Sequence, residues 1–321
     1  MIGYTLGQPT MNIRTMQLVN QDDESAFLKG PFNLKEEDAY EKWRSDKLLS
    51  APRDVMELIV PITGLSTATD YEVTKILALY RRANMAIYTC RDKFIDPEAL
   101  RGFGALFGLK HVDHHLCASE HGVARLSSTG EGPERLYAPY SNRSLSWHTD
   151  GYYNAPNKHV RTVILHCAAP AAAPPDTGGE NALLGPELAY IHLRDESRDF
   201  ITALMHPDCL TIPANQISDD DIRPARSGPV FSINPVNGRL HMRFTARKRH
   251  VIWRDDATTR AAVDCLLEML NDPAGPALRY RLGPGEGLIS NNVLHNRTAF
   301  DDDPTAPRLL YRARFNDEIG N

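Results

Sequence analysis

The segment W-H-T-D-G at residues 147–151 places an imidazole and a carboxylate two positions apart. In an extended chain, residues i and i+2 point to the same side, so His148 and Asp150 can direct both side chains at one point. Such a pair supplies two of the three protein ligands of an open metal site. The same spacing also occurs in an ordinary salt-bridged pair on a strand.

A second segment far downstream, at residues 285–300, supplies the missing ligand type in His295. Two histidines and one carboxylate on one face of a metal leave other positions open, which is the ligand set of non-heme Fe(II) oxygenases rather than of a closed zinc site. Arg308 follows, and its planar guanidinium can bind a carboxylate such as the distal one of 2-oxoglutarate through two hydrogen bonds. We therefore expect Fe(II), 2-oxoglutarate and O2 at this site.

Several short motifs occur in the order seen in taurine dioxygenase-like Fe(II)/2-oxoglutarate oxygenases, and the chain resembles this family over residues 147–314. The motifs are W-H-T-D at 147–150, T-G-G-E-N at 177–181 with Ala189 and Tyr190 after it, N-G-R at 237–239, and His295 followed by Arg308 and Arg312. The resemblance implies that His148, Asp150 and His295 are the catalytic iron ligands and that Arg308 is the main anchor of 2-oxoglutarate. Asn181 takes the position of a family threonine that helps to hold the same carboxylate, and its amide can donate that hydrogen bond.

The resemblance also points to substrate-binding residues. Arg312 corresponds to a family arginine that faces an anionic substrate, and the alternative for it is a structural ion pair with Asp317 or with one of the acids at 301–303. Tyr152 and Tyr153 directly follow the metal motif, so strand alternation predicts that one of them faces the pocket and the other packs outward.

Residues 111–121 contain four histidines and one cysteine, yet their spacing fits no standard zinc site. In the resembled family this region is a loop over the substrate pocket, so one interpretation is a substrate contact from His111, Asp113 or His115, with His115 as the candidate, and the other is a structural role. A second cluster, the basic run at 243–250, is interpreted as a solvated strand and turn or as a contact with one anionic substrate.

The resemblance implies hydroxylation of an unactivated C–H bond with release of succinate and CO2, although desaturation or dealkylation would use the same ligands. A small anionic substrate is expected: an amino acid, a sulfonate, a betaine or a sugar acid such as Kdo. Two alternatives stay open. They are a metal-binding jelly-roll protein without oxygenase turnover and a zinc-dependent hydrolase that uses the same His/Asp/His set.

The composition of the chain argues against several other classes of protein. The 321 residues include 36 Lys and Arg against 41 Asp and Glu, a formal net charge of −5, which disfavours a general nucleic-acid binder. No apolar stretch is long enough for a membrane span, and the first residues do not read as a signal peptide, so a cytoplasmic location is expected. The five cysteines are scattered, which favours free thiols. The expected partner is a small molecule, with a homo-oligomer left open.

Periodicity predicts the elements that position these residues. Helices are expected at 36–47, 71–84, 96–107, 186–194 and 257–271, with Asp96 and Asp256 as N-caps. Strands are expected at 85–90, 122–127, 161–167, 229–234, 239–244, 278–282, 287–290 and 308–315, with a hairpin turn at 234–238.

The strands do not alternate regularly with helices, so a mostly antiparallel β core fits better than a doubly wound sheet. The predicted fold is α+β, mainly β: a double-stranded β-helix of the jelly-roll or cupin type with surrounding helices. We expect a single oxygenase domain over 1–321, with a mainly helical part at 1–121 and the jelly-roll core at 122–321. The segments 169–178 and 206–228 are expected to be inserted lids.

Overall fold

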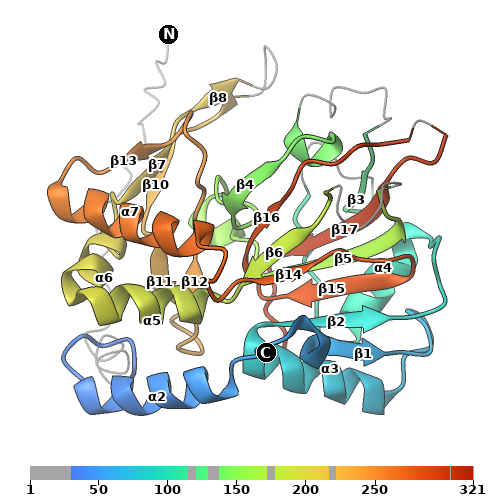
Figure 1. The fold of residues 1–321 in the computed structure, drawn as a ribbon, viewed down its shortest axis with the longest axis horizontal. Coiled ribbons are helices and arrows are strands. Elements are labelled where there is room, and N and C mark those ends of the chain that lie inside the picture. Colours follow the sequence, from blue (N-terminus) through green and yellow to red (C-terminus); the bar gives the residue numbers. More distant parts are fainter. Residues whose placement is uncertain are drawn as a thin grey trace, which may run out of the picture.

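The computed structural model describes residues 30–114, 121–128, 137–171, 178–216, 222–303 and 305–320. These residues form two larger β-sheets, three small ones, and helices on the outer sides of the sheets (Figure 1). Within the described part of the chain, no helix is long and apolar enough to cross a membrane.

The larger sheet has six strands in the order β1-β2-β15-β5-β17-β3. Only the β1–β2 pair is parallel, and every other pair in this sheet is antiparallel. The strands are β1 (Ile59–Pro61), β2 (Met85–Thr89), β15 (Glu286–Ser290), β5 (Thr162–Ala169), β17 (Leu309–Phe315) and β3 (Val123–Leu126).

The second sheet has four antiparallel strands in the order β14-β6-β16-β4. They are β14 (Leu278–Tyr280), β6 (Asn181–Leu184), β16 (Leu294–Arg297) and β4 (Leu145–His148). In the β16–β4 pair, His295 lies directly opposite His148.

Alternation along the strands explains how the layers pack. In β2, Met85 and Ile87 belong to a buried cluster that also contains Leu183 of β6, so this face of the six-stranded sheet packs toward the four-stranded one. Ala86 and Tyr88 belong instead to the cluster that includes buried side chains of the helices α3 (Asp70–Ala83) and α4 (Pro97–Ala105). The six-stranded sheet is therefore buried on both faces.

The other face of the four-stranded sheet is covered by a third buried cluster, to which β6 contributes Ala182 and Leu184. Helices α5, α6 and α7 pack together there, with α2 against α5 (Figure 1). The elements of this layer are α2 (Glu37–Ser50), α5 (Pro186–Glu196), α6 (Arg198–Leu204), α7 (Ala257–Asn271), and the hairpin of β11 (Phe231–Ile233) and β12 (Leu240–Met242).

Shorter elements complete the described chain. β7 (Leu210–Ile212) lies between β10 (Arg226–Gly228) and β13 (Ile252–Trp253), and β8 (Asn215–Gln216) pairs with β9 (Ile222–Arg223). The single-turn 3₁₀ helices are η1 (Val55–Leu58), η3 (Ala138–Tyr140) and η4 (Pro156–Lys158). The segment 206–228, which was expected to be a lid loop, therefore contains paired strands.

The mixed sheets and outer helices agree with the coarse fold class predicted from the sequence. The side chains of Asp96 and Asp256 accept hydrogen bonds from backbone N–H groups in the first turns of α4 and α7, which confirms both predicted N-caps. The hairpin turn is confirmed as well, with Gly238 at φ +68°. The prediction missed α6 and several short strands, among them β1, β6 and β16, because runs of three to seven residues carry too little periodicity.

Candidate metal and cosubstrate site

The structure brings His148, Asp150 and His295 together. One potential ligand atom from each of these residues lies within 4.8 Å of the other two. The two imidazole rings are 4.2 Å apart between centroids because their strands, β4 and β16, are adjacent and in register. Asp150 lies just past the end of β4 and not within the strand.

Both histidines are fixed by their own backbone. Nδ1 of His148 lies 2.8 Å from the carbonyl oxygen of Ser146, and Nδ1 of His295 lies 2.9 Å from that of Val293. A carbonyl oxygen can only accept, so in each bond Nδ1 carries the proton and donates it. This leaves Nε2 as the nitrogen of each ring that can offer a lone pair to a metal.

The Asp150 carboxylate is held from one side by arginines. Its Oδ1 lies 3.2 Å from Nη1 of Arg312 and 3.8 Å from Nη1 of Arg314. Burial acts to raise the pKa of Asp150, but the two guanidinium groups outweigh it and hold that pKa below its ordinary value. The group is therefore a carboxylate at neutral pH.

The chemistry of this donor set fits a divalent metal. Oδ2 of Asp150 is buried and has no hydrogen-bond partner among the described residues. Burial, and then the nearby His295, lower the pKa of His148 to about 3, so its ring is neutral. A buried anionic oxygen without a partner is costly, and a cation bound between it and two imidazole lone pairs would compensate it.

A recess of about 210 Å³ contains the expected cosubstrate residues, because Arg308 and Asn181 both line it. The Arg308 side chain is buried, and burial lowers its pKa to about 10, so it is still charged at neutral pH. Within the described ranges its guanidinium makes no hydrogen bond, although it lies over the ring of Phe300. A buried cation at the wall of a recess is a site for an anion.

Arg281 lines the same recess and was missed by the sequence interpretation. It directly follows β14, which pairs with β6 so that Tyr280 lies opposite Asn181. One of its Nη atoms donates to the carbonyl oxygen of Ala171, another residue of the recess wall. Arg281 comes to lie in the same recess as Arg308 because β14 pairs with β6, and the sequence does not reveal this pairing.

The inner face of β17 carries a pair of arginines. Leu310, Arg312 and Arg314 share this face by alternation, and both arginines are buried. The structural partner expected for Arg312 was Asp317 or an acid at 301–303, which is wrong: its ion pair is with Asp150. Sequence reasoning missed Arg314. Its position two residues after Arg312 was the signal that could have found it, because residues at i and i+2 of a strand share one face.

Arg314 also joins a second carboxylate to the site. Its Nη2 lies 2.5 Å from Oδ2 of the buried Asp113, and its Nη1 donates to the Tyr153 hydroxyl at 3.2 Å. Nδ2 of Asn154 donates to the other oxygen of Asp113 at 3.0 Å. Asp113 is therefore engaged by the protein itself.

Tyr152 and Tyr153 do not alternate as in a strand. Gly151 has φ +65° and starts a turn, in which the two phenol rings contact each other at 5.2 Å between centroids. The Tyr152 ring lies 6.5 Å from that of His148, and its hydroxyl accepts from Arg247 at 3.2 Å. The strand alternation on which the prediction of one inward and one outward tyrosine rested is absent, because the extended chain ends at the metal motif.

The remaining candidates come from the histidine-rich segment 111–121 and the basic run 243–250. His115 is outside the described residues, and His111 contacts Asp317 at the surface. Arg243, expected in a solvated run, is buried and donates to four backbone carbonyl groups. Its acceptors are the carbonyl oxygens of Tyr152, Leu210, Arg226 and Gly228.

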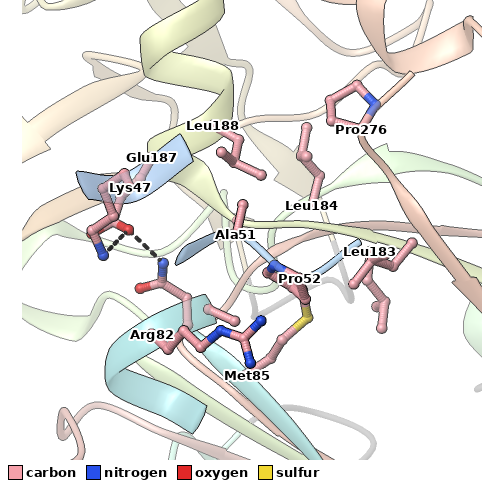
Figure 2. A pocket seen from close by; sticks show the side chains of 14 residues that line it. Lys47, Ala51, Pro52, Arg82, Met85, Leu183, Leu184, Glu187, Leu188 and Pro276 are labelled. Carbon is pink, nitrogen blue, oxygen red and sulfur yellow. Dashed lines mark hydrogen bonds and ion pairs between the residues drawn. The ribbon is translucent and has the colours of Figure 1, made fainter. Parts of the chain in front are cut away.

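A second recess, of about 390 Å³, lies away from these residues (Figure 2). Its wall is mainly apolar, and its charged side chains are already paired. Glu187 contacts Lys47 at 2.5 Å and accepts a hydrogen bond from Asn84, as the dashed lines show. None of the residues expected in the active site lines it.

Comparisons with known proteins agree with this geometry. A uridine-5'-phosphate dioxygenase from Streptomyces sp is 27% identical over 179 residues, which are 54% of this chain and 62% of that protein. The chain thus matches about three fifths of the length of this relative.

Solved structures of other proteins share the fold of this chain. An asparagine oxygenase in complex with Fe(II), hydroxyasparagine and succinate matches with a TM-score of 0.57 at 16% identity, over 78% of this chain and 81% of that one. A taurine dioxygenase from Burkholderia xenovorans matches with a TM-score of 0.52 at 18% identity, over 81% and 85%.

The model of one protein family matches residues 86–314. This range includes the three metal-ligand candidates, Arg308 and Arg312, and it covers more than half of the chain. The protein belongs to the taurine catabolism dioxygenase TauD, TfdA family.

Proposed function

We propose that the protein is an Fe(II)- and 2-oxoglutarate-dependent dioxygenase that oxidises a C–H bond of a small anionic substrate. One observation carries the proposal. Three side chains converge at a single point. Two are imidazoles whose Nδ1 atoms are bonded to backbone carbonyl groups, which leaves Nε2 for a metal. The third is a carboxylate with a buried oxygen that has no partner among the described residues. Family membership supports the same chemistry.

We further propose that the two facing sheets form a double-stranded β-helix and that the chain works as one oxygenase unit. The shared buried cluster between the six-stranded and four-stranded sheets supports this arrangement. Strands β1 and β2, from the N-terminal part, join the six-stranded sheet, which ties that part to the core.

His148, Asp150 and His295 would hold the iron through two Nε2 atoms and Oδ2. When bound, the metal supplies the oxygen-activating chemistry that couples decarboxylation of 2-oxoglutarate to substrate oxidation. The carbonyl groups of Ser146 and Val293 keep the two rings oriented, and they increase the basicity of the ligand nitrogens. Arg312 and Arg314 balance the negative charge of Asp150 from the opposite oxygen.

Arg308 would bind the distal carboxylate of 2-oxoglutarate, with the Asn181 amide as a second donor. Because the guanidinium is buried, its attraction for a carboxylate is screened less than it would be at the surface. The cosubstrate would thereby be held in one orientation relative to the metal.

The charges near the metal support an anionic substrate. Arg312 lies beside Asp150, Arg247 donates to the Tyr152 hydroxyl, and Arg223 lies 5.3 Å from the centre of the Tyr153 ring. Aromatic rings next to guanidinium groups suit a substrate with a planar part and an anionic part. Since the Streptomyces relative is described as acting on uridine 5'-phosphate, nucleoside phosphates join amino acids, sulfonates, betaines and sugar acids as candidates.

The test begins without oxygen. Fe(II) and 2-oxoglutarate are added to the purified apoprotein, and the weak visible charge-transfer band of the chelate is recorded for the wild type, His148→Ala and Arg308→Ala. We expect the band in the wild type only. The candidate substrates are then screened in air for succinate release, and the oxidised product is identified by mass spectrometry, which separates hydroxylation from desaturation and dealkylation.

A wild-type protein without the band, but with tight Zn(II) binding that depends on His148, would overturn the proposal in favour of a hydrolase. Metal binding with no 2-oxoglutarate binding and no succinate release would favour a metal-binding protein without turnover.

A further inference from the structure

The connection between β15 and β16 contains a buried asparagine that contacts the candidate metal site. Residues 291–293 lead from the six-stranded sheet to the four-stranded one, and His295 follows shortly after. Asn292 is only 4% exposed, and its backbone has φ +43°. Asparagine tolerates this left-handed region better than most residues other than glycine.

The Asn292 side chain is hydrogen-bonded to two segments of the chain. Its Oδ1 accepts from the Asp150 backbone N–H at 2.7 Å, and its Nδ2 donates to the Asp150 carbonyl oxygen at 2.9 Å. Nδ2 also donates to the carbonyl oxygen of Val160 at 2.8 Å. One amide therefore satisfies both backbone groups of Asp150 and links them to the segment that leads into β5.

This contact matters for Asp150 because its backbone has left the sheet. β4 ends at His148, and Gly151 turns the chain with φ +65°. A backbone at such a position lacks the ladder hydrogen bonds that hold the two histidines in place. The amide of Asn292 replaces them and is buried, so water does not compete for the same groups.

We propose that Asn292 is a positioning residue of the metal centre. It holds the backbone of Asp150 so that Oδ2 faces His148 and His295. The inference rests on the proposed function, because it assigns the residue that orients one of the three metal ligands.

The neighbouring residue provides a matched control. Asn291 has the same side chain, but its Nδ2 donates to Oδ1 of Asn84 at 3.2 Å, and its backbone N–H donates to the Asn84 carbonyl oxygen at 2.7 Å. Asn84 in turn donates to Glu187 at 3.0 Å, at the recess of Figure 2. Asn291 is therefore hydrogen-bonded away from the metal centre.

The experiment compares Asn292→Gly and Asn291→Ala with the wild type. Glycine keeps the positive φ without strain and removes the side chain with its amide. Binding of Fe(II) and Co(II) to the full-length apoprotein is titrated without oxygen, the visible spectrum of bound Co(II) is recorded, and circular dichroism checks the fold.

We expect Asn292→Gly to weaken metal binding by about 10- to 100-fold, as removal of groups that orient metal ligands typically does, and to alter the Co(II) spectrum. Asn291→Ala should leave both unchanged. If Asn292→Gly does not fold, Asn292→Asp is titrated in its place. It keeps the acceptor for the Asp150 N–H and loses both donors, so the same weakening is expected.

Equal metal affinity and an unchanged Co(II) spectrum in a folded Asn292 variant would overturn this role and leave the metal site intact. Equal weakening in the Asn291 and Asn292 variants would overturn it too, because the effect would then be general loosening of the connection. Failure of the wild type to bind Fe(II), or binding that persists in His148→Ala, would instead overturn the proposed function itself.

Discussion

The two larger sheets contribute different chemistry to the same site. The four-stranded sheet supplies the imidazoles, His148 from β4 and His295 from β16, whereas β17 of the six-stranded sheet supplies the guanidinium groups of Arg312 and Arg314. Imidazoles reach only a short distance, so their strands must be neighbours in register. Arginines reach further, so they can act from the facing sheet. Metal binding by the imidazoles and anion binding by Arg308, which directly precedes β17, should therefore be separable by mutation.

The largest effect is expected on the four-stranded sheet. His295→Ala removes one of the three proposed metal ligands, and we expect the affinity for Fe(II) to fall by more than the roughly 100-fold that loss of an orienting group produces. His192→Ala, on α5, changes a histidine outside the cluster and should bind Fe(II) like the wild type. Anaerobic titration of both variants measures the difference. Retention of affinity in His295→Ala would remove this histidine from the ligand set.

The six-stranded sheet should instead respond to overpacking at its centre. A Cβ at Gly287 of β15 would lie 2.0 Å from the Tyr88 ring and 2.4 Å from the Leu165 carbonyl oxygen. We expect Gly287→Ala to reduce the free energy of unfolding by about 3 kcal/mol, as measured by urea denaturation.

Gly102→Ala is the matched control, because Gly102 is inside α4 and its Cβ would meet nothing within 4 Å. Alanine is favoured over glycine there by about 0.5–1 kcal/mol, so this variant should be neutral or more stable. Similar urea midpoints for the two variants would mean that the sheet relaxes around the added methyl group.

The separation of metal and anion binding is tested most directly at Arg308. Arg308→Ala should bind Fe(II) normally and lose about 2–3 kcal/mol of 2-oxoglutarate affinity, roughly 30- to 150-fold in Kd. Arg308→Lys should recover only part of this, because an ammonium group cannot form two parallel hydrogen bonds. Calorimetry without oxygen measures both ligands. A matching loss of Fe(II) affinity would show that the two functions are not separable.

Two imidazoles outside the site, the buried His241 and the half-buried His159, show what burial does without any metal. His159 and His241 stack at 4.8 Å between centroids, and burial, helped by Arg161 and Arg243, lowers the pKa of His159 to about 4. Burial also holds the pKa of His241 well below its ordinary value. The unfolded chain binds protons near 6.5, so stability should fall as the pH drops from 6.5 toward 4.

Thermal unfolding across this pH window measures the effect, and His159→Gln should flatten the dependence in part, because it removes one of the rings whose pKa is lowered, the others being His148, His166 and His241. An unchanged slope in that variant would assign the pH dependence to other groups.

The smallest effect is expected at Asn181, on the edge of the cosubstrate recess. Asn181→Thr replaces one hydrogen-bond donor with another, so the Kd for 2-oxoglutarate should change by less than about tenfold, the range of a single hydrogen bond. A change as large as that of Arg308→Ala would make Asn181 an equal partner in binding. The leucine side chain of Asn181→Leu has no hydrogen-bond donor, so its Kd for 2-oxoglutarate is the reference for complete loss of this hydrogen bond.

Sequence reasoning selected three residues of a distinctive chemical type, which the structure brings together, but it missed residues whose place depends on the three-dimensional fold. His148, Asp150 and His295 are noticeable because few other roles need that set. Asn292 is not, because its contacts with Asp150 join residues 142 positions apart in the chain. Arg243 looked like part of a solvated run, yet its acceptors come from segments that only the fold assembles around it.

Residues 291–293 also bear on how the length of this chain can vary. Because side chains alternate with a period of two, one residue added between β15 and β16 would turn His295 away from His148 or break the register of the whole four-stranded sheet. The described residues of the segment 206–228 make no hydrogen bond with the three metal-ligand candidates. Among homologues, insertions and deletions should therefore accumulate in 206–228 and be absent from 291–293.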